Sequence, residues 1–307
     1  MHPFQNIMIG LAGTDQDGEL IRYSAMLAGL AGVREMHFVH VLPHQSIYSN
    51  TEVSTSYDHA VELIRDSVAE HLGDAPRQTA ISYHVLSGDR VDRLLEFAAE
   101  HENDLVIVGH RKSQSGRRSL ARRLAMKAPC SVWMVPEGSA PTLKRILVPV
   151  DFSEPAADAL SVATALANLS GERDCIGLHV YFNEATTTYD EYDEVIRGRE
   201  KEAFSRFISP VNLHGVYVRP LFEEGSNVAN VIGRIAEKHG ADLIVMGTRG
   251  RSRSAAILLG SETEHTIMES RIPVLAVKHF GARLNMLQAL LDKRLRNRGG
   301  VRFSSIL

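Results

Sequence analysis

The chain of 307 residues is long enough for two domains of about 150 residues each. Its hydrophobic content of 44% and charged content of 23% are ordinary for a soluble globular protein, and its formal net charge of −3 excludes a global positive field that would recruit nucleic acid. We find no apolar stretch near about 20 residues, so we expect no transmembrane segment, and "MHPFQNIMIG" lacks the features of a signal peptide. Only two cysteines, Cys130 and Cys175, are present in apolar surroundings, so we expect buried thiols and a cytoplasmic location.

The chain repeats itself. "NIMIGLAGTDQDGELIRYSAMLAGLAGVREMHFVHV" (6–41) aligns without a gap with "RILVPVDFSEPAADALSVATALANLSGERDCIGLHV" (145–180). "FAAEHENDLVIVGHR" (97–111) matches "IAEKHGADLIVMGTR" (235–249), and "APCSVWMVP" (128–136) resembles "SRIPVLAVK" (270–278). The sequence therefore predicts a first domain over 1–137, a second over 143–280, a short linker between them and a basic C-terminal tail over 281–307.

Taken in chain order, the second copy predicts strands at about 145–150, 175–181, 216–222, 242–247 and 273–278. These are short continuous apolar runs, which are typical of parallel strands covered on both faces. Between the first two, 155–169 carries an amphipathic helical stripe with Ser153 as N-cap and Pro155 in the first turn. The predicted fold is α/β, with two tandem doubly wound parallel five-stranded sheets. Such sheets bind ligands at the carboxyl ends of their strands, where the strand order reverses.

A glycine-rich stretch follows the fourth strand of the second copy. In "VMGTRGRSRSAAILLGSETEH", Gly247, Gly250 and Gly260-Ser261 have the spacing G-x2-G-x9-G-S, which is neither the Walker nor the Rossmann pattern. A helix is expected at about 261–270, so the glycines lie between a strand and a helix N-terminus, where backbone N–H groups bind anions. Arg249, Arg251 and Arg253 could add charge-assisted bonds to phosphate, and Ser261 could add a hydroxyl or cap the helix. A solvated loop with a capped helix is the alternative.

These segments resemble the universal stress protein family, in particular its ATP-binding branch. The resemblance rests on "RILVPVDFS", "GLHVY", "ADLIVMGTRGRSRSAAILLGSETEHTI" and "IPVLAVK", and it covers nearly the whole chain as two copies. It implies that the second domain binds ATP, with or without Mg²⁺. Asp151 matches the acidic residue that contacts the nucleoside, and apolar strand ends would give the base a dry slot. The positions implied for binding ATP are Pro149, Val150, Asp151, Val180, Met246, Gly247, Arg249, Gly250, Gly260 and Ser261.

The first copy departs from this pattern. Ala12 replaces Asp151 and Gly10 replaces Pro149, while Gly109 is kept and Lys112 replaces Gly250. Arg118-Ser119 falls where Gly260-Ser261 stands in the second copy, so we expect no ATP site in the first domain. Its loop is basic instead, which predicts a solvated face or, alternatively, an anion site or docking patch. The basic residues are Arg111, Lys112, Arg117, Arg118, Arg122 and Arg123.

No catalytic residues are predicted. There is no Walker lysine and no arrangement that clearly positions an attacking water, so the protein is at most a weak ATPase. We expect a stress-response sensor or switch; the alternative is a non-enzymatic scaffold whose nucleotide is structural. A metal site is not expected, because His37 and His40 point to opposite faces of a strand, with His44 beyond it. His40 and His179, in matching strands, are predicted to be structural.

The two copies are expected to associate through their last strands. The resemblance implies that the strands "VWMVP" (132–136) and "VLAVK" (274–278) meet edge to edge, which would protect both edges. We also expect a homodimer, a signalling partner of unknown identity and no specific nucleic acid.

Segments 44–63 and 183–202 are predicted to be loops that enter helices, with a lid as one interpretation. The tail carries Leu284, Leu287, Leu291 and Leu295 at helical spacing, which indicates a packed helix, a dimer contact, or a membrane-surface or acidic-partner segment.

Overall fold

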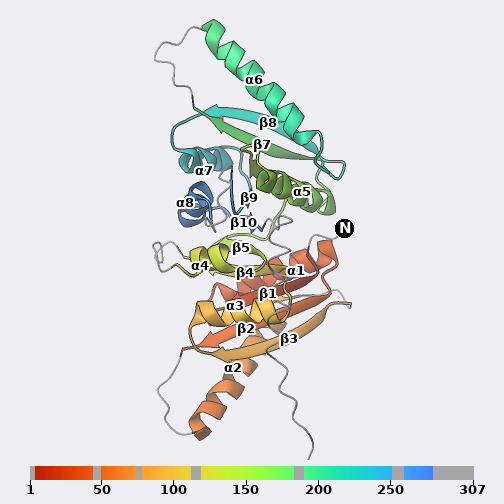
Figure 1. Ribbon diagram of the computed structural model, residues 1–307. Helices are drawn as coiled ribbons and strands as arrows, with labels where there is room; N and C mark the ends of the chain where they lie inside the picture. Colours follow the sequence, from red (N-terminus) through yellow and green to blue (C-terminus); the bar gives the residue numbers. More distant parts are fainter. Residues whose placement is uncertain are drawn as a thin grey trace, which may run out of the picture.

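The computed structural model describes residues 4–43, 50–73, 78–111, 119–182, 190–250 and 259–278, with backbone alone at 50–56 and 190–197. The tail over 281–307, His44, Lys112, Arg117, Arg118, Arg251 and Arg253 lie outside these residues. The described chain folds into strands that alternate with helices, and the strands form a single ten-stranded sheet (Figure 1). Among the described residues, no helix has both the length and the apolar character needed to cross a membrane.

The first half of the molecule runs from β1 to β5. Its strands are β1 (Asn6–Leu11), β2 (Glu35–Leu42), β3 (Ala80–Ser87), β4 (Leu105–His110) and β5 (Ser131–Pro136). Its helices are α1 (Asp17–Ala31), α2 (Asn50–His71), α3 (Arg90–Glu100) and α4 (Leu120–Lys127). All neighbouring strands in this half are parallel, in the order β3-β2-β1-β4-β5.

The second half repeats this arrangement. Its strands are β6 (Ile146–Pro149), β7 (Asp174–Tyr181), β8 (Tyr217–Glu224), β9 (Leu243–Gly247) and β10 (Val274–Val277), in the order β8-β7-β6-β9-β10. Its helices are α5 (Glu154–Leu169), α6 (Asp190–Ile208), α7 (Val228–Lys238) and α8 (Ser261–Glu269). The predicted strands and the predicted helices at 155–169 and 261–270 are therefore confirmed to within a few residues. Ser153 is the N-cap of α5, as expected, and its Oγ accepts from the Ala156 N–H at 3.3 Å.

The two halves join through β5 and β10, which meet edge to edge as the family resemblance implies, and the pairing is antiparallel. The helices cover both faces of the sheet, and each face carries one cluster of buried apolar side chains that extends across both halves. α1, α2, α5 and α6 contribute to one cluster, and α3, α4, α7 and α8 contribute to the other. Because the hydrophobic core is shared, the two halves stabilise one another.

Candidate functional site

The candidate site lies in the second half, at the carboxyl ends of β6, β7 and β9. β6 lies between β7 and β9 in the sheet, so this is the point where the strand order reverses. A cavity of about 640 Å³ opens there. All of the predicted site residues except Gly260 line it: Pro149, Val150, Asp151, Val180, Met246, Gly247, Arg249, Gly250 and Ser261.

Asp151 is held by the turn that connects β6 to α5. Its Oδ1 accepts from the Ser153 N–H at 3.1 Å and from the Ser153 hydroxyl at 2.5 Å. Phe152, between them, has a φ of 65°, a left-handed conformation that is rare for an aromatic residue. A Cβ at Gly250 would lie 2.7 Å from Asp151 Oδ2, so glycine lets the loop after β9 approach this carboxylate. The turn therefore fixes a carboxylate at the wall of the cavity, against the glycine-rich loop.

A cluster of rings supports this turn from behind. His179 of β7 stacks on Phe152 with ring centroids 4.3 Å apart, and Phe207 of α6 lies 5.6 Å from Phe152. His179 Nδ1 is 2.6 Å from the carbonyl oxygen of Val150, which makes that nitrogen the donor. Its Nε2 lies 3.2 Å from a carboxylate oxygen of Glu200. His179 thus ties the end of β6 to α6, and the structural role predicted for it is confirmed.

Gly247 is required by packing. A Cβ at this position would lie 2.8 Å from both the Cβ and the carbonyl oxygen of Pro155, at the start of α5. The carbonyl oxygen of Gly247 accepts from the buried hydroxyl of Thr263 at 2.8 Å, which anchors the first turn of α8 to β9. Gly247 therefore brings a strand and two helices together at the floor of the cavity.

Gly260 has a different environment. It is the N-cap of α8, with φ −70° and ψ 147°, and its N–H donates to the carbonyl oxygen of Thr248 at 2.8 Å. The nearest atom to a Cβ at this position would be that same carbonyl oxygen, at 3.7 Å, so the described residues leave room for a side chain. The expectation that Ser261 caps the helix is wrong, because Ser261 is the first helical residue and α8 has no side-chain cap. Among the described residues, no side chain caps the N-terminal N–H groups of α8.

The charges around the cavity are mixed. Arg249 lines it, and the pKa of Lys278, at the end of β10, is lowered first by burial and then by the charge of the Arg249 guanidinium. Glu262 also lines the cavity, but its Oε2 accepts from the Ala229 N–H at 3.1 Å, at the N-terminus of α7. One carboxylate of the α8 first turn is thus directed to the neighbouring helix, and cationic side chains remain at the ends of β9 and β10.

Several lining residues were not predicted individually. Glu200 fell only within the predicted lid segment, and Phe182 and Thr263 were not singled out. Phe182 follows β7 directly and its surface is 63% exposed, so an aromatic residue just past a strand end was the available signal. Glu200 could not be recognised, because its place in the cavity depends on where α6 crosses β7.

In the first half the corresponding turn is occupied by the protein itself. The carboxylate of Asp17 accepts from the N–H groups of Ala12 and Gly13, at 3.0 and 2.7 Å. The side chain of Gln16 fills the space next to Gly109, where a Cβ would overlap its amide. His40 Nδ1 lies 3.2 Å from the Leu11 carbonyl oxygen, the contact that His179 makes in the second half. The cavity at this position is about 260 Å³.

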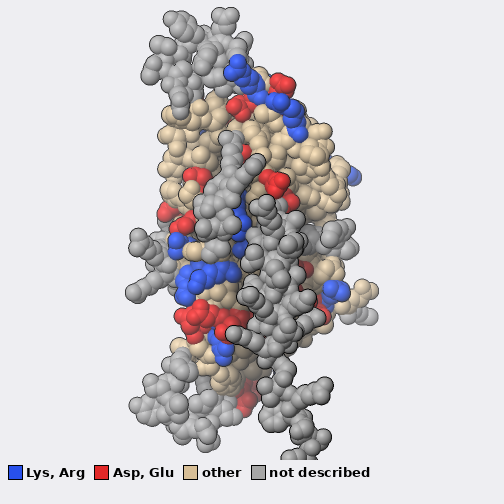
Figure 2. Space-filling model, viewed as in Figure 1, with Lys and Arg blue, Asp and Glu red and all other residues tan. Residues whose placement is uncertain are grey.

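Three of the basic residues predicted to form the first-half patch are described, and each is engaged in an ion pair. Arg111 lies 3.5 Å from Glu137, and Arg122 lies 2.5 Å from Glu264. Arg123 lies 3.5 Å from Asp89 of α3. Figure 2 shows basic and acidic side chains side by side over α4 and α3. These arginines are therefore neutralised by carboxylates, which weakens the interpretation of this face as an anion site.

The described histidines at the edge of the first half contact one another and neighbouring polar groups. His37 Nδ1 lies 2.7 Å from the Ser82 hydroxyl and its Nε2 lies 3.0 Å from Asn6 Oδ1, so both ring nitrogens have protein partners. His84 and His101 lie close by, with ring centroids 5.5 and 5.2 Å from that of His37. Across the described part of the chain, no group of three or more potential ligands is arranged to hold a metal ion.

Comparison with known proteins agrees with the duplicated fold. The sequence model of the universal stress protein family matches residues 3–136 and, again, residues 142–278. One universal stress protein of Methanocaldococcus jannaschii is 32% identical over 143 residues, covering 44% of this chain and 82% of that protein. A second from the same organism is 29% identical over 154 residues, covering 44% and 94%. A universal stress protein structure from Archaeoglobus fulgidus has a TM-score of 0.66 at 20% identity, covering 91% of this chain and 98% of that one, which supports the shared fold.

Proposed function

Because the chain belongs to the universal stress protein family, we propose that its second half binds ATP and that the protein acts as a nucleotide-dependent sensor or switch in a stress response. The observation that carries the proposal is the meeting of the Asp151 carboxylate with the uncapped N-terminus of α8 around one cavity. A carboxylate suits hydroxyl or amine hydrogens, and a helix N-terminus suits phosphate.

The parts of the cavity correspond to the parts of a nucleotide. Val150, Val180 and Met246 offer apolar surface for a base, and Asp151 offers an acceptor for the nucleoside. Arg249 and the first N–H groups of α8 would hold the phosphates. A volume of about 640 Å³ is within the usual range for a small-molecule site, which spans about 300–1,000 Å³. Gly260 supports this assignment, because the described neighbours leave room for a side chain at this position, so that packing against them does not explain the glycine and close approach of a ligand does.

We expect hydrolysis to be slow at most. Among the described residues that line the cavity, none is a lysine, and the described carboxylates of the α8 first turn are engaged by Ala229 and Arg122. An oxygen ligand set suits Mg²⁺, and a bound ion would be held mainly by the phosphates. We also propose a cytoplasmic location, supported by two buried free cysteines, and a homodimer whose contact surface is not the β5–β10 junction.

Calorimetric titration of ATP, with and without Mg²⁺, tests the proposal. Wild type is expected to bind at one site per chain, Gly260→Val to lose binding because its side chain enters the cradle, and Asp151→Asn to weaken it. Gly29→Val is the matched control, because Gly29 lies on α1 of the first half and a Cβ there meets nothing within 4 Å. Absence of binding by nucleotide-free wild type, or equal loss in the control, would overturn the proposal.

A further inference from the structure

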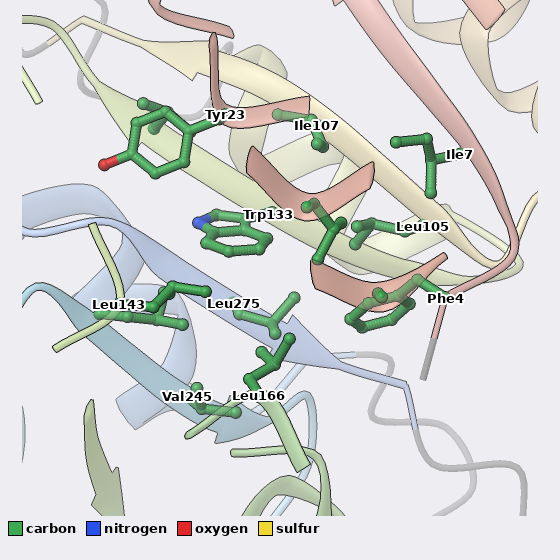
Figure 3. Close-up of a cluster of buried hydrophobic side chains, with 14 of the residues drawn as sticks. Phe4, Ile7, Tyr23, Leu105, Ile107, Trp133, Leu143, Leu166, Val245 and Leu275 are labelled. Carbon is green, nitrogen blue, oxygen red and sulfur yellow. The ribbon is translucent and has the colours of Figure 1, made fainter. Parts of the chain in front are cut away.

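The junction between the two halves is built around a local twofold axis. In the β5–β10 pair, Val274 lies opposite Met134, Leu275 opposite Trp133 and Ala276 opposite Val132. The register is symmetric about the central pair, so Trp133 and Leu275 are equivalent positions of the two repeats. Both side chains are fully buried, and Trp133 lies between Tyr23 of α1 and Leu275 (Figure 3). A large side chain thus faces a smaller one where a symmetric dimer would place two identical ones.

A second pair of equivalent positions differs in charge, as Trp133 and Leu275 differ in size. Arg122 of α4 and Glu264 of α8 each lie the same number of residues before the C-cap of their helix, and so are also equivalent positions. Arg122 Nε donates to Glu264 Oε1 at 2.5 Å, and the side chains are 20% and 36% exposed. Opposite charges therefore meet across the axis where repeats of one kind would bring together like charges.

The same helices make another contact across the junction. His110, at the end of β4, is buried and lies near enough to α8 that the backbone of Met268 raises its pKa, although burial, the larger cause, lowers it. α8 is therefore held by the first half at Glu264 and again near its C-terminal end. These contacts extend the junction beyond the two edge strands.

We infer that this junction is specified for pairing of unlike halves, first with second, and that it opposes pairing of like halves. Two first halves would place two tryptophans in the space that holds one tryptophan and one leucine, and would bring two arginines together. Two second halves would leave a void between two leucines and would bring two glutamates together. Size and charge thus discriminate against both like pairings, which is specificity obtained by unfavourable alternatives as well as by favourable contacts.

Charge reversal in the full-length chain tests this inference. Arg122→Glu and Glu264→Arg each place the same charge at both positions, as pairing of like halves would. Each is expected to lower the folding equilibrium constant by about tenfold or more, and the double reversal is expected to return it to within about threefold of wild type. The midpoint of urea denaturation can be followed by fluorescence of Trp133, the one tryptophan of the chain, which is buried at the junction.

A neutral variant and a matched ion pair complete the test. Arg122→Gln removes the pair without adding repulsion, so it should fall between wild type and Arg122→Glu, and it remains measurable if the reversal prevents folding. Arg234 and Glu223 lie 3.1 Å apart within the second half, so reversing their charges should change the equilibrium constant by less than about threefold. Failure of the double reversal to recover stability, or equal losses in Arg122→Gln and Arg122→Glu, would overturn the inference.

Discussion

Adding one methyl group should lower the free energy of unfolding at Gly247 and leave it almost unchanged at Gly260, two glycines at the end of β9 and in the loop that follows it. In Gly247→Ala the new Cβ would lie 2.8 Å from the Cβ and the carbonyl oxygen of Pro155. Carbon atoms pack at about 3.5–4.0 Å, so the start of α5 must move by about 1 Å. Overpacking of this kind costs about 1–3 kcal/mol, and because backbone atoms are involved we expect about 2 kcal/mol or more.

The same substitution at Gly260 should be almost neutral for stability. Its φ and ψ suit alanine, and the nearest atom to the new Cβ would be 3.7 Å away. Alanine is a poorer N-cap than glycine by about 0.5 kcal/mol, while reduced freedom of the unfolded chain returns about 0.4–1 kcal/mol. The expected change in the free energy of unfolding is therefore within about 1 kcal/mol of zero.

Urea denaturation of both variants, followed by Trp133 fluorescence, gives the two differences in one experiment. Calorimetry with ATP should then show weaker binding by Gly260→Ala although its stability is retained. A neutral Gly247→Ala would refute the packing argument, and a Gly260→Ala as destabilised as Gly247→Ala would show that Gly260 is needed by the fold.

Three other predictions follow from buried groups of the described chain. Burial and neighbouring histidines lower the pKa of His37 and His84, so below about pH 6.5 the unfolded chain binds more protons than the folded chain. The urea midpoint should therefore decrease as the pH is lowered from 7.5 to 5.5, and it should decrease less in His84→Phe. The Nε1 of Trp133 has no hydrogen-bond partner among the described residues, so Trp133→Phe loses no hydrogen bond. Measured by circular dichroism, the free energy of unfolding should fall by about 3–5 kcal/mol in Trp133→Ala, which leaves a cavity, and by much less in Trp133→Phe. Burial raises the pKa of Cys130 and Cys175 to about 12, so iodoacetamide at pH 8 should alkylate the folded protein at least about a hundredfold more slowly than the unfolded chain; equal rates would contradict their burial.

The fold could be predicted because its signals are local. The strands read as continuous apolar runs and the repeat aligned without a gap, so one copy supported the interpretation of the other. Ser153 and Pro155 marked the start of α5 by side-chain chemistry that acts within a few residues. The strand ends that form the cavity followed from the strand order of doubly wound sheets, whereas the individual site residues followed from the resemblance to the universal stress protein family, and almost all of them line the cavity.

What could not be predicted depends on contacts between distant segments. Gly247 and Gly260 look alike in sequence, and only the position of Pro155 distinguishes a glycine needed for packing from one that leaves space. The basic residues of the first half suggested a positive patch, yet Arg122 meets Glu264 because β5 and β10 pair. Pairing of segments this far apart in sequence is set by the tertiary structure rather than by local propensity.

The two turns that follow β1 and β6 show how one fold can lose a site and remain stable. In the second half Asp151 places its carboxylate at the wall of an open cavity and holds its turn through Ser153. In the first half Asp17, from within α1, places a carboxylate on the N–H groups of Ala12 and Gly13. The backbone donors of that turn are thus satisfied by the chain itself, without a ligand. Asp17 accepts from Ala12 and Gly13 with different carboxylate oxygens, so its replacement by asparagine should destabilise the first half. Asp151 accepts from Ser153 with Oδ1, an acceptor that asparagine keeps, so Asp151→Asn should cost less stability while weakening binding. The contrast can be measured by urea denaturation without nucleotide, and equal losses of stability would show that both turns depend on their carboxylates in the same way.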